Sequence, residues 1–460
     1  SMAWAAESGA NVVMCGGGGI VCFYPTALPY QRVSEYLPVG RDLLGELVAA
    51  AHARGIRILA RMDVSKHYRP LYEAHPDWFA HDRAGQPLRV GDGQLYVTCP
   101  NGEYRQRCTF EIMGEILDRY PVDGFFFNAF PFQGCECLTC RRRFEEEAGQ
   151  PYPAEGALGA WRELGAWRSA VITRLAGKVR DFLHERDPNV LSSIDFHLTT
   201  DRPAGQRAQG FDNLALPNVV DAITVEAHVT LNRAPPQWPY WAGEECRLAR
   251  TFQDNQPITV LLSYFDLQGS RRSGQPPGQL AYDVMQIAAC GGQPWIALSG
   301  TAEGVGGQDD TRALPALQET YRFLARHESY YRDVESAARV AVVYSRPSLE
   351  WLAHEGQSPG LQGPRQWVHE YRGCYAALAE DHVPFDVLYH EHLGSADSGA
   401  RWTADRLAER YRLLVLPDLL CLSDDDAATL DAYVERGGAL LCTGEIGRYD
   451  REGRPRSGTG

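Results

Sequence analysis

The chain has 460 residues, of which 44% are hydrophobic and 23% are charged. Its 59 Asp and Glu residues outnumber its 45 Lys and Arg residues, so the formal net charge is −14. This composition is that of an ordinary folded protein and excludes collagen, a coiled coil or general disorder. The acidic balance disfavours nucleic acid or an anionic membrane as a partner. No apolar run reaches the length of about 18 residues that a transmembrane helix requires.

The 12 cysteines are too few for a disulfide scaffold of this length. The first ten residues lack the charged region and the apolar core of a signal peptide. We therefore expect a reduced, cytoplasmic protein that is not attached to a membrane.

Apolar, strand-like runs alternate with segments of helical period over most of the chain. The predicted strands lie at 11–15, 56–63, 122–130, 190–197, 221–228, 258–266 and 294–299. The predicted helices lie at 4–8, 42–54, 104–120, 157–186 and 280–290. This alternation predicts an α/β fold with a parallel sheet flanked by helices, and its spacing favours a (β/α)8 TIM barrel.

Seven strands are one fewer than a closed barrel of this type contains. One explanation is that the glycine run 16–19 separates two barrel strands, at 11–15 and 20–24. The other is that the first strand lies upstream of Ser1. We favour the second, because residues 4–8 already have the pattern of the helix that would follow such a strand.

A second unit follows the predicted barrel. Short strands are expected at 339–345, 385–389, 413–417 and 439–443, with helices at 370–381 and 424–436 between them. This order predicts a flavodoxin-like α/β domain. It lacks a Gly-rich phosphate loop, so we expect no organic cofactor. We place the barrel domain at residues 1–333 and the second domain at 334–460.

Three closely spaced cysteines follow one predicted barrel strand: Cys135, Cys137 and Cys140. Their spacing lets three thiolates converge on one tetrahedral ion such as zinc. The fourth ligand would come from Cys99 or Cys108. The alternative is that all these residues are free or half-buried thiols.

Polar residues end successive predicted strands. In a (β/α)8 barrel the active site lies at these carboxyl ends. A loop role remains the alternative for each residue taken singly. A Pro-rich loop adds an aromatic side chain, and aromatic faces beside carboxylates suit a sugar ring. The candidate residues are Asp63, Lys66, His67, Asn128, Asp195, His197, Glu226, His228, Trp238, Tyr264 and Asp266.

Several motifs together resemble the β-galactosidases of glycoside hydrolase family 42. They are Cys99-Pro100-Asn101 with Tyr104-Arg105, a strand ending in Asn128, the Cys135-x-Cys137-x2-Cys140 run, and Arg143-Phe144. Residues 11–26, 63–66 and 122–128 look still closer to a group of poorly characterised family-42-like barrel hydrolases.

The resemblance implies a glycosidase with a carbohydrate substrate, in which Asn128 binds a sugar hydroxyl. It also implies a structural zinc held by Cys99, Cys135, Cys137 and Cys140, which favours Cys99 over Cys108. The second domain is similar to the trimerisation domain of these enzymes, which implies a homo-oligomer, a dimer or a trimer.

The chain departs from the family at both catalytic positions. The family's acid/base Glu follows the Asn at the end of strand four, where this chain has Ala129. The family's nucleophile is a Glu at the end of strand seven, where this chain reads Ser263-Tyr264-Phe265-Asp266. Neither catalytic Glu carries over at its expected position.

Glycoside hydrolysis needs two carboxyl groups that flank the scissile bond. We predict Glu226 and Asp195, because they end neighbouring strands and because the apolar run before Glu226 would raise its pKa. Asp63 and Asp266 are the reserves. The groups that would orient the substrate or stabilise the transition state are Lys66, His67, Asn128, His197 and His228, and Trp238 and Tyr264 would contact the sugar.

Two other functions remain open. One is a carbohydrate-binding pseudoenzyme that has lost the family's acid/base, which Ala129 supports. The other is a metal-dependent hydrolase that uses His67, His197 and His228. The second lacks a His-x-His or His-Glu-x-x-His ligand pair.

Overall fold

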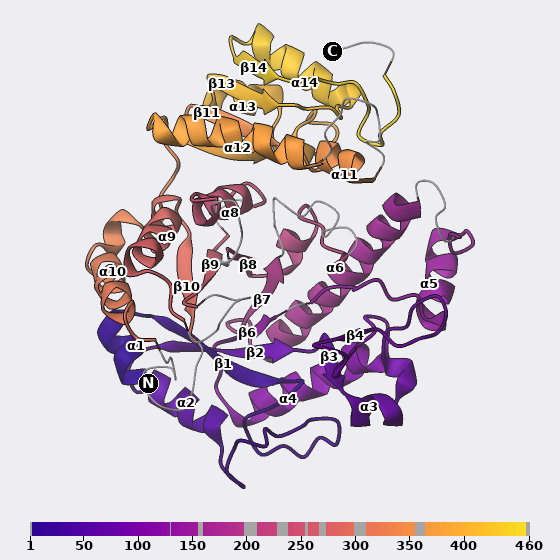
Figure 1. Ribbon diagram of the computed structural model, residues 1–460, viewed down its shortest axis with the longest axis vertical. Coiled ribbons are helices and arrows are strands. Elements are labelled where there is room, and N and C mark those ends of the chain that lie inside the picture. Colours follow the sequence, from indigo (N-terminus) through magenta and orange to yellow (C-terminus); the bar gives the residue numbers. More distant parts are fainter. Residues whose placement is uncertain are drawn as a thin grey trace.

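The computed structural model describes residues 2–128, 130–154, 160–196, 209–227, 238–253, 256–265, 273–298, 310–354 and 364–456. Two units are stacked along the long axis of the molecule (Figure 1). The larger unit contains the N-terminus and a curved sheet surrounded by helices. The smaller unit contains the C-terminus and covers one side of the larger one. The predicted order of the two units along the chain is therefore seen in the structure.

The larger unit has one parallel sheet of seven strands. Their order is β1 (Val12–Gly19), β2 (Arg57–Asp63), β6 (Gly124–Phe127), β7 (Leu191–Phe196), β8 (Ala222–Glu226), β9 (Ile258–Ser263) and β10 (Gln293–Ala297). The ring centroids of Phe126 on β6 and Trp295 on β10 are 4.9 Å apart, although three strands separate β6 from β10. The sheet is therefore curved into a half-barrel, and the α/β prediction of a parallel, TIM-barrel-like sheet is confirmed.

The glycine run continues β1 and does not separate two strands. Residues 20–24 form only an isolated bridge, between Cys22 and Val33, so the explanation that places a second barrel strand there, which was not the favoured one, is excluded. The physical reason is close packing against β2. A Cβ on Gly17 would lie 3.0 Å from the Cβ of Ala60, and one on Gly19, whose φ is +105°, would lie 2.0 Å from the carbonyl oxygen of Asp63. Larger residues do not fit there.

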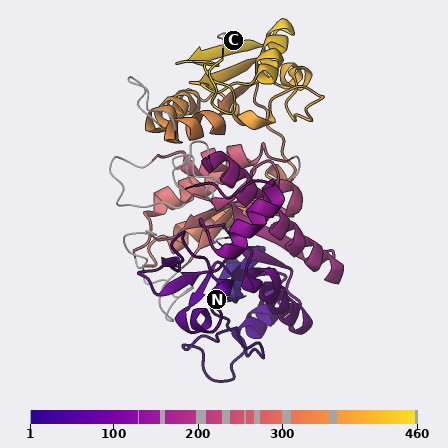
Figure 2. The same ribbon diagram turned by 90° about the vertical axis from the view of Figure 1, so that its right-hand side faces the viewer.

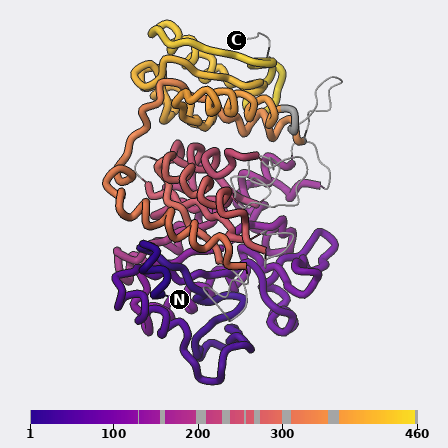
Figure 3. The backbone as a smooth tube through the Cα atoms, turned by 60° about the vertical axis from the view of Figure 1, so that its left-hand side comes forward, coloured from indigo at the N-terminus to yellow at the C-terminus, as the bar shows by residue number. Residues whose placement is uncertain are grey.

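Helices surround this sheet. They are α1 (Met2–Ser8), α2 (Leu43–His52), a π-helix at 104–108 that continues into α4 (Thr109–Arg119), α6 (Ala160–Arg186), α8 (Trp241–Ala249), α9 (Pro277–Ala289) and α10 (Leu314–Arg326). The first and last of them meet, since Arg322 on α10 donates from Nε to the carbonyl oxygen of Glu7 at 2.7 Å. Figure 3 views the side on which α10 approaches the N-terminus.

A small antiparallel sheet was not expected from the sequence. It consists of β3 (Lys66–Tyr68), β5 (Leu95–Val97) and β4 (Arg89–Val90), beside α3 (Arg69–Ala74) and α5 (Leu138–Ala148). Lys66 and His67 therefore lie on a strand, where a loop was expected. Further 3₁₀ turns occupy 76–78, 216–219, 328–330 and 390–392.

The smaller unit is a parallel four-stranded sheet in the order β12 (Phe385–Tyr389), β11 (Val340–Tyr344), β13 (Leu413–Pro417) and β14 (Ala439–Thr443). This is the 2-1-3-4 order with which a flavodoxin-like sheet begins, so that prediction is confirmed. Its helices are α11 (Arg346–His354), α12 (Pro364–Glu380), α13 (Ala404–Arg410) and α14 (Asp424–Glu435). Ser423 starts α14 with a capping box.

The two units meet through helices. Helix α12 lies on the side of the smaller unit that faces α8 of the larger one, and Figure 2 shows the same stacking from the side. Arg372 on α12 forms an ion pair with Glu244 on α8, with 2.9 Å between nitrogen and oxygen. Among the helices that the structure describes, none combines the length and the apolarity needed to cross a bilayer.

Candidate active site and cysteine cluster

The register of the seven strands determines which side chains face the inside of the half-barrel. Phe126 pairs with Arg61 on one side and with Ser193 on the other, and paired residues of neighbouring strands face the same way. Because side chains alternate along a strand, every second residue from these positions also faces inward. At the carboxyl ends of the strands the inward residues are Asp63, Asn128, Asp195, Glu226 and Ser263.

Asp195 and Glu226, which were predicted as a pair, are brought together on β7 and β8. Asp195 is only 1% exposed. Burial raises the pKa of Asp195 well above its usual value, and the charge of Glu226 and a hydrogen bond to it raise this pKa further. The positive charge of Arg61 opposes this shift. The state in which both carboxyls are ionised is therefore disfavoured, and the protonated form of Asp195 is favoured.

Asp63 at the end of β2 has a different environment. Its carboxylate accepts hydrogen bonds from the Lys66 Nζ at 2.9 Å and from the Ser65 Oγ at 2.8 Å. Two such hydrogen bonds, one of them from a charged donor, hold the Asp63 carboxylate in place. The inner face thus carries the hydrogen-bonded pair Asp195 and Glu226 and the ion-paired Asp63.

The structure places three other predicted site residues in differing surroundings. Asn128 directly follows β6 and is half-buried. His67 packs against the ring of Tyr104, and burial lowers the pKa of its imidazole to about 4, so it is neutral at pH 7. Trp238 precedes α8 and lines a cavity, described below. His197, His228 and Asp266 lie outside the described residues.

Tyr264 faces away from the inside of the half-barrel, because it follows the inward Ser263. It is fully buried, and its hydroxyl accepts a hydrogen bond from the backbone N–H of Ala313 at 3.0 Å. This contact favours a packing role over the predicted contact with substrate. Sequence reasoning overlooked Arg61, although its position two residues before Asp63 on the same strand was an available signal.

The four cysteines that the family resemblance implied lie together. The sulfur atoms of Cys99, Cys135, Cys137 and Cys140 are all within 4.8 Å of one another, and Cys108 is outside the group. Cys99 follows β5, Cys135 lies in the loop after β6, and the other two lie at the start of α5.

These positions fit a tetrahedral metal ion. With zinc–sulfur bonds of about 2.3 Å, the sulfur atoms of such a site are about 3.8 Å apart. The Sγ of Cys99 lies 3.7 Å from that of Cys137 and 3.4 Å from that of Cys140. The amide of Asn101 donates to the Cys140 sulfur at 3.3 Å and accepts from Arg143 at 2.9 Å. Such outer contacts orient the ligands of metal sites.

Two separate parts of the sequence match models of known protein families. Residues 2–129 match the family model described as "Hypothetical glycosyl hydrolase 6", and residues 338–459 match the one described as "Beta-galactosidase trimerisation domain". The chain is similar to the GH42 β-galactosidases. This confirms the resemblance stated from its motifs.

Solved structures extend the similarity to almost the whole chain. Gan42B, a GH42 β-galactosidase from G. stearothermophilus, superimposes with a TM-score of 0.75 at 18% identity, over 99% of this chain and 70% of its own. The β-galactosidase from Bacillus circulans sp. alkalophilus gives a TM-score of 0.73 at 16% identity, over 99% and 70% of the two chains.

An α-L-fucosidase, isoenzyme 2 from Paenibacillus thiaminolyticus, gives a TM-score of 0.70 at 18% identity, and the match covers 96% of this chain and 60% of that one. The chain thus spans between 60% and 70% of the length of these three relatives. No curated protein matches the sequence. The GH42-like relatives therefore establish the fold.

Proposed function

We propose that the chain is a glycoside hydrolase that acts on a small glycoside or an oligosaccharide, with Asp195 and Glu226 as its catalytic carboxyls. The observation that carries this proposal is the carboxyl pair itself. Buried Asp195 is hydrogen-bonded to Glu226 on the neighbouring strand, at the inner face of a GH42-like half-barrel, and its pKa is raised. Buried acidic pairs with displaced pKa values are a common feature of catalytic sites.

The two carboxyls take different roles. Asp195 is the general acid, because its raised pKa favours the protonated form, which can donate to the leaving oxygen. Glu226 is the ionised partner that acts on the sugar carbon or on a water. A hydrogen-bonded pair is closer than the spacing of about 5–5.5 Å found in retaining enzymes. The glycosidic oxygen therefore replaces Glu226 as the hydrogen-bond partner of Asp195 when substrate binds.

Other residues at or after the strand ends bind and orient the sugar. Asp63, held by Lys66, is the third carboxylate of the site and accepts from sugar hydroxyls. Asn128 and neutral His67 supply further hydrogen bonds, and Arg61 stabilises negative charge near the pair. His197, His228 and Asp266 remain proposed substrate contacts at the strand ends, and Trp238 remains a proposed aromatic contact.

We also propose a structural zinc at the four cysteines and a homo-oligomer, a trimer by analogy with the matched domain. Zinc would neutralise the thiolates and join the segment after β5 to the loop after β6 and to the start of α5. That loop follows Asn128, so the metal would fix one wall of the proposed sugar site.

Turnover of a panel of nitrophenyl glycosides tests the catalytic assignment. Wild type is compared with Glu226→Gln and Asp195→Asn. The control is Asp221→Asn, which alters the carboxyl directly before the first residue of β8. We expect both site variants to lose activity and Asp221→Asn to retain it. Circular dichroism shows whether each variant is folded.

Two further outcomes would point to the other functions. If wild type cleaves a glycoside and both site variants keep its full rate, the assignment is wrong. Sugar binding without turnover would favour the carbohydrate-binding pseudoenzyme. Loss of activity with a chelator, without unfolding, would favour the metal-dependent hydrolase.

A further inference from the structure

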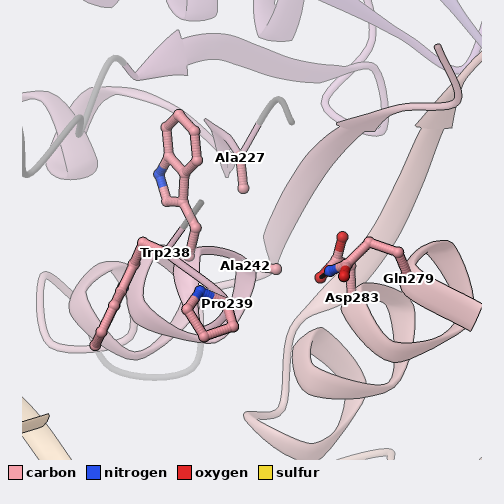
Figure 4. A pocket seen from close by; sticks show the side chains of 7 residues that line it. Ala227, Trp238, Pro239, Ala242, Gln279 and Asp283 are labelled. Atoms are coloured by element: carbon pink, nitrogen blue, oxygen red, sulfur yellow. Dashed lines mark hydrogen bonds between the residues drawn. The ribbon is translucent and has the colours of Figure 1, made fainter. Parts of the chain in front are cut away.

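A cavity of about 60 Å³ lies behind the end of β8 (Figure 4). Ala227 follows Glu226, so by the alternation of the strand its side chain points away from the inside of the half-barrel. The cavity is therefore separate from the proposed sugar site, although the two are one residue apart on the chain. Its lining residues are Ala227, Trp238, Pro239, Trp241, Ala242, Gln279 and Asp283.

Asp283 on α9 is the acidic group of this cavity. The residue is 4% exposed, and its Oδ1 accepts from the amide of Gln279 at 2.8 Å and from that of Gln286 at 3.4 Å. Its other oxygen, Oδ2, is buried and has no hydrogen-bond partner among the described residues. In Figure 4 the carboxyl of Asp283 and the amide of Gln279 lie together across the cavity from Trp238.

Among the described residues of the cavity wall, this carboxyl has no counter-charge. None of the described lining residues is basic, and the others are aromatic, aliphatic or an amide. A buried carboxylate is costly unless it is paired with a cation or hydrogen-bonded by donors. Arg372, which lies 5.1 Å from the centre of the Trp238 ring, forms its ion pair with Glu244 at 2.9 Å.

The size and the ligand atoms of the cavity restrict its occupant. A water molecule takes up about 30 Å³ in the liquid, so the space admits about two bodies of that size. Cavities that hold drug-sized molecules begin at about 300 Å³, so a sugar ring is too large. Calcium and magnesium prefer six or more oxygen ligands, whereas the wall offers one carboxylate and one amide. A small monovalent cation fits both the size of the cavity and the small number of oxygen ligands in its wall.

We propose that this cavity binds a monovalent cation of ammonium size, with the Asp283 carboxylate as its counter-charge and the indoles of Trp238 and Trp241 as its walls. Aromatic faces attract such cations, and a weakly hydrated ion enters an aromatic wall at lower cost than a strongly hydrated one. The cation is ammonium or potassium in free form, or the terminal ammonium of a primary amine. This inference does not depend on the proposed glycosidase activity.

Thermal unfolding and calorimetry of the full chain test this site. The probes are NH4Cl, KCl and methylamine hydrochloride, each compared with tetramethylammonium chloride at equal ionic strength. A ligand of one or two heavy atoms should have a dissociation constant on the order of 0.1 M or somewhat below. We expect the small cations to raise the unfolding midpoint and the bulky one to have no such effect. Methylamine binding as well as ammonium would indicate an amine ligand, and its failure would indicate a free ion.

Asp283→Asn, which keeps the shape of the side chain, should weaken this binding at least tenfold. Asp181→Asn, whose side chain on α6 is 65% exposed, is the control and should behave as wild type. Crystals soaked in a thallium(I) salt give a second readout that needs no variant, with an anomalous peak expected beside Oδ2 of Asp283. Equal effects of all four chlorides, equal responses of wild type and Asp283→Asn, or no thallium in the cavity would each overturn the proposal.

Discussion

Asp195 and Glu226, on neighbouring strands of the half-barrel, are hydrogen-bonded to each other, and this contact together with burial raises the pKa of Asp195. Two carboxylates this close, one of them fully buried, cannot both be ionised at low energy. At the two positions where the resembled family has its catalytic Glu residues, this chain has Ala129 and the segment Phe265-Asp266. Under the proposed function, the hydrogen-bonded pair on β7 and β8 would supply the acid and the base in place of these two residues.

The pH dependence of turnover should report this pair. Because the pKa of Asp195 is raised, activity should fall on the alkaline side only well above the ordinary carboxyl range of about 4. Asp195→Asn should lose this alkaline limb and reduce kcat by about 10²- to 10⁴-fold. Stopped assays across the pH range, with Asp221→Asn as the control, measure both effects. An unchanged alkaline limb in Asp195→Asn would remove Asp195 from the acid role.

Metal content tests the cysteine cluster. Elemental analysis of the purified chain should find about one zinc per chain, because the four sulfur atoms have the separations of a tetrahedral site. Cys140→Ala should lose the metal and lower the unfolding midpoint. Cys108→Ala is the matched control, since Cys108 is also fully buried but lies outside the cluster. A chain that keeps its zinc without Cys140 would contradict this ligand set.

The strand pattern explains why the fold could be predicted from the sequence. Each buried strand is bounded by glycines or polar residues, and a strand–helix alternation leaves few arrangements. The structure of the glycine run could not be predicted, because Gly16–Gly19 have no side chains and so show no alternation of apolar and polar residues. Its continuation as a strand depends on the close approach of β2, which only the packed structure reveals.

The site was predictable only in part. Asp63, Asp195 and Glu226 could be selected because carboxyls at strand ends meet at one edge of a barrel. The direction of the Tyr264 side chain could not be predicted, since it depends on the register that turns Ser263 inward. Asp283 could not be found, because a helical Asp gains its importance from a cavity formed by residues distant in sequence.

Stability should depend on pH through Asp283. Burial raises the pKa of this carboxyl from 3.8 to about 7 in the folded state. The stabilisation that goes with its neutral form is fully present below the unfolded pKa and is lost as the pH rises to about 7. The loss amounts to about 4 kcal/mol at most.

Urea unfolding at pH 5 and pH 8, in tetramethylammonium buffers, measures this effect. Asp283→Asn cannot ionise, so its free energy of unfolding should exceed that of wild type at pH 8 by more than it does at pH 5. The exposed control, Asp181→Asn, should follow wild type at both values. Parallel behaviour of wild type and Asp283→Asn would show that Asp283 does not titrate in this range.

A buried chain of hydrogen bonds in the smaller unit leads to the last prediction. The Oγ of Ser345 lies 2.8 Å from Nδ1 of His390, whose Nε2 lies 3.2 Å from Oδ2 of Asp426. Ser348 joins Ser345 at 2.8 Å. The order of groups is that of a Ser-His-Asp hydrolase, but Ser345, His390 and Asp426 are all fully buried. A nucleophile needs access to substrate, so the geometry indicates a structural role that links the ends of β11 and β12 to the start of α14.

Ser345→Ala should therefore lower the free energy of unfolding by about 1–3 kcal/mol, because it leaves the buried nitrogen of His390 without this partner. Ser398→Ala, at an exposed hydroxyl of the same unit, should change it little. Urea unfolding measures both variants, and nitrophenyl ester hydrolysis, measured beside it, should be absent in wild type. An esterase activity that Ser345→Ala abolishes would instead mean that the smaller unit opens and carries a second catalytic site.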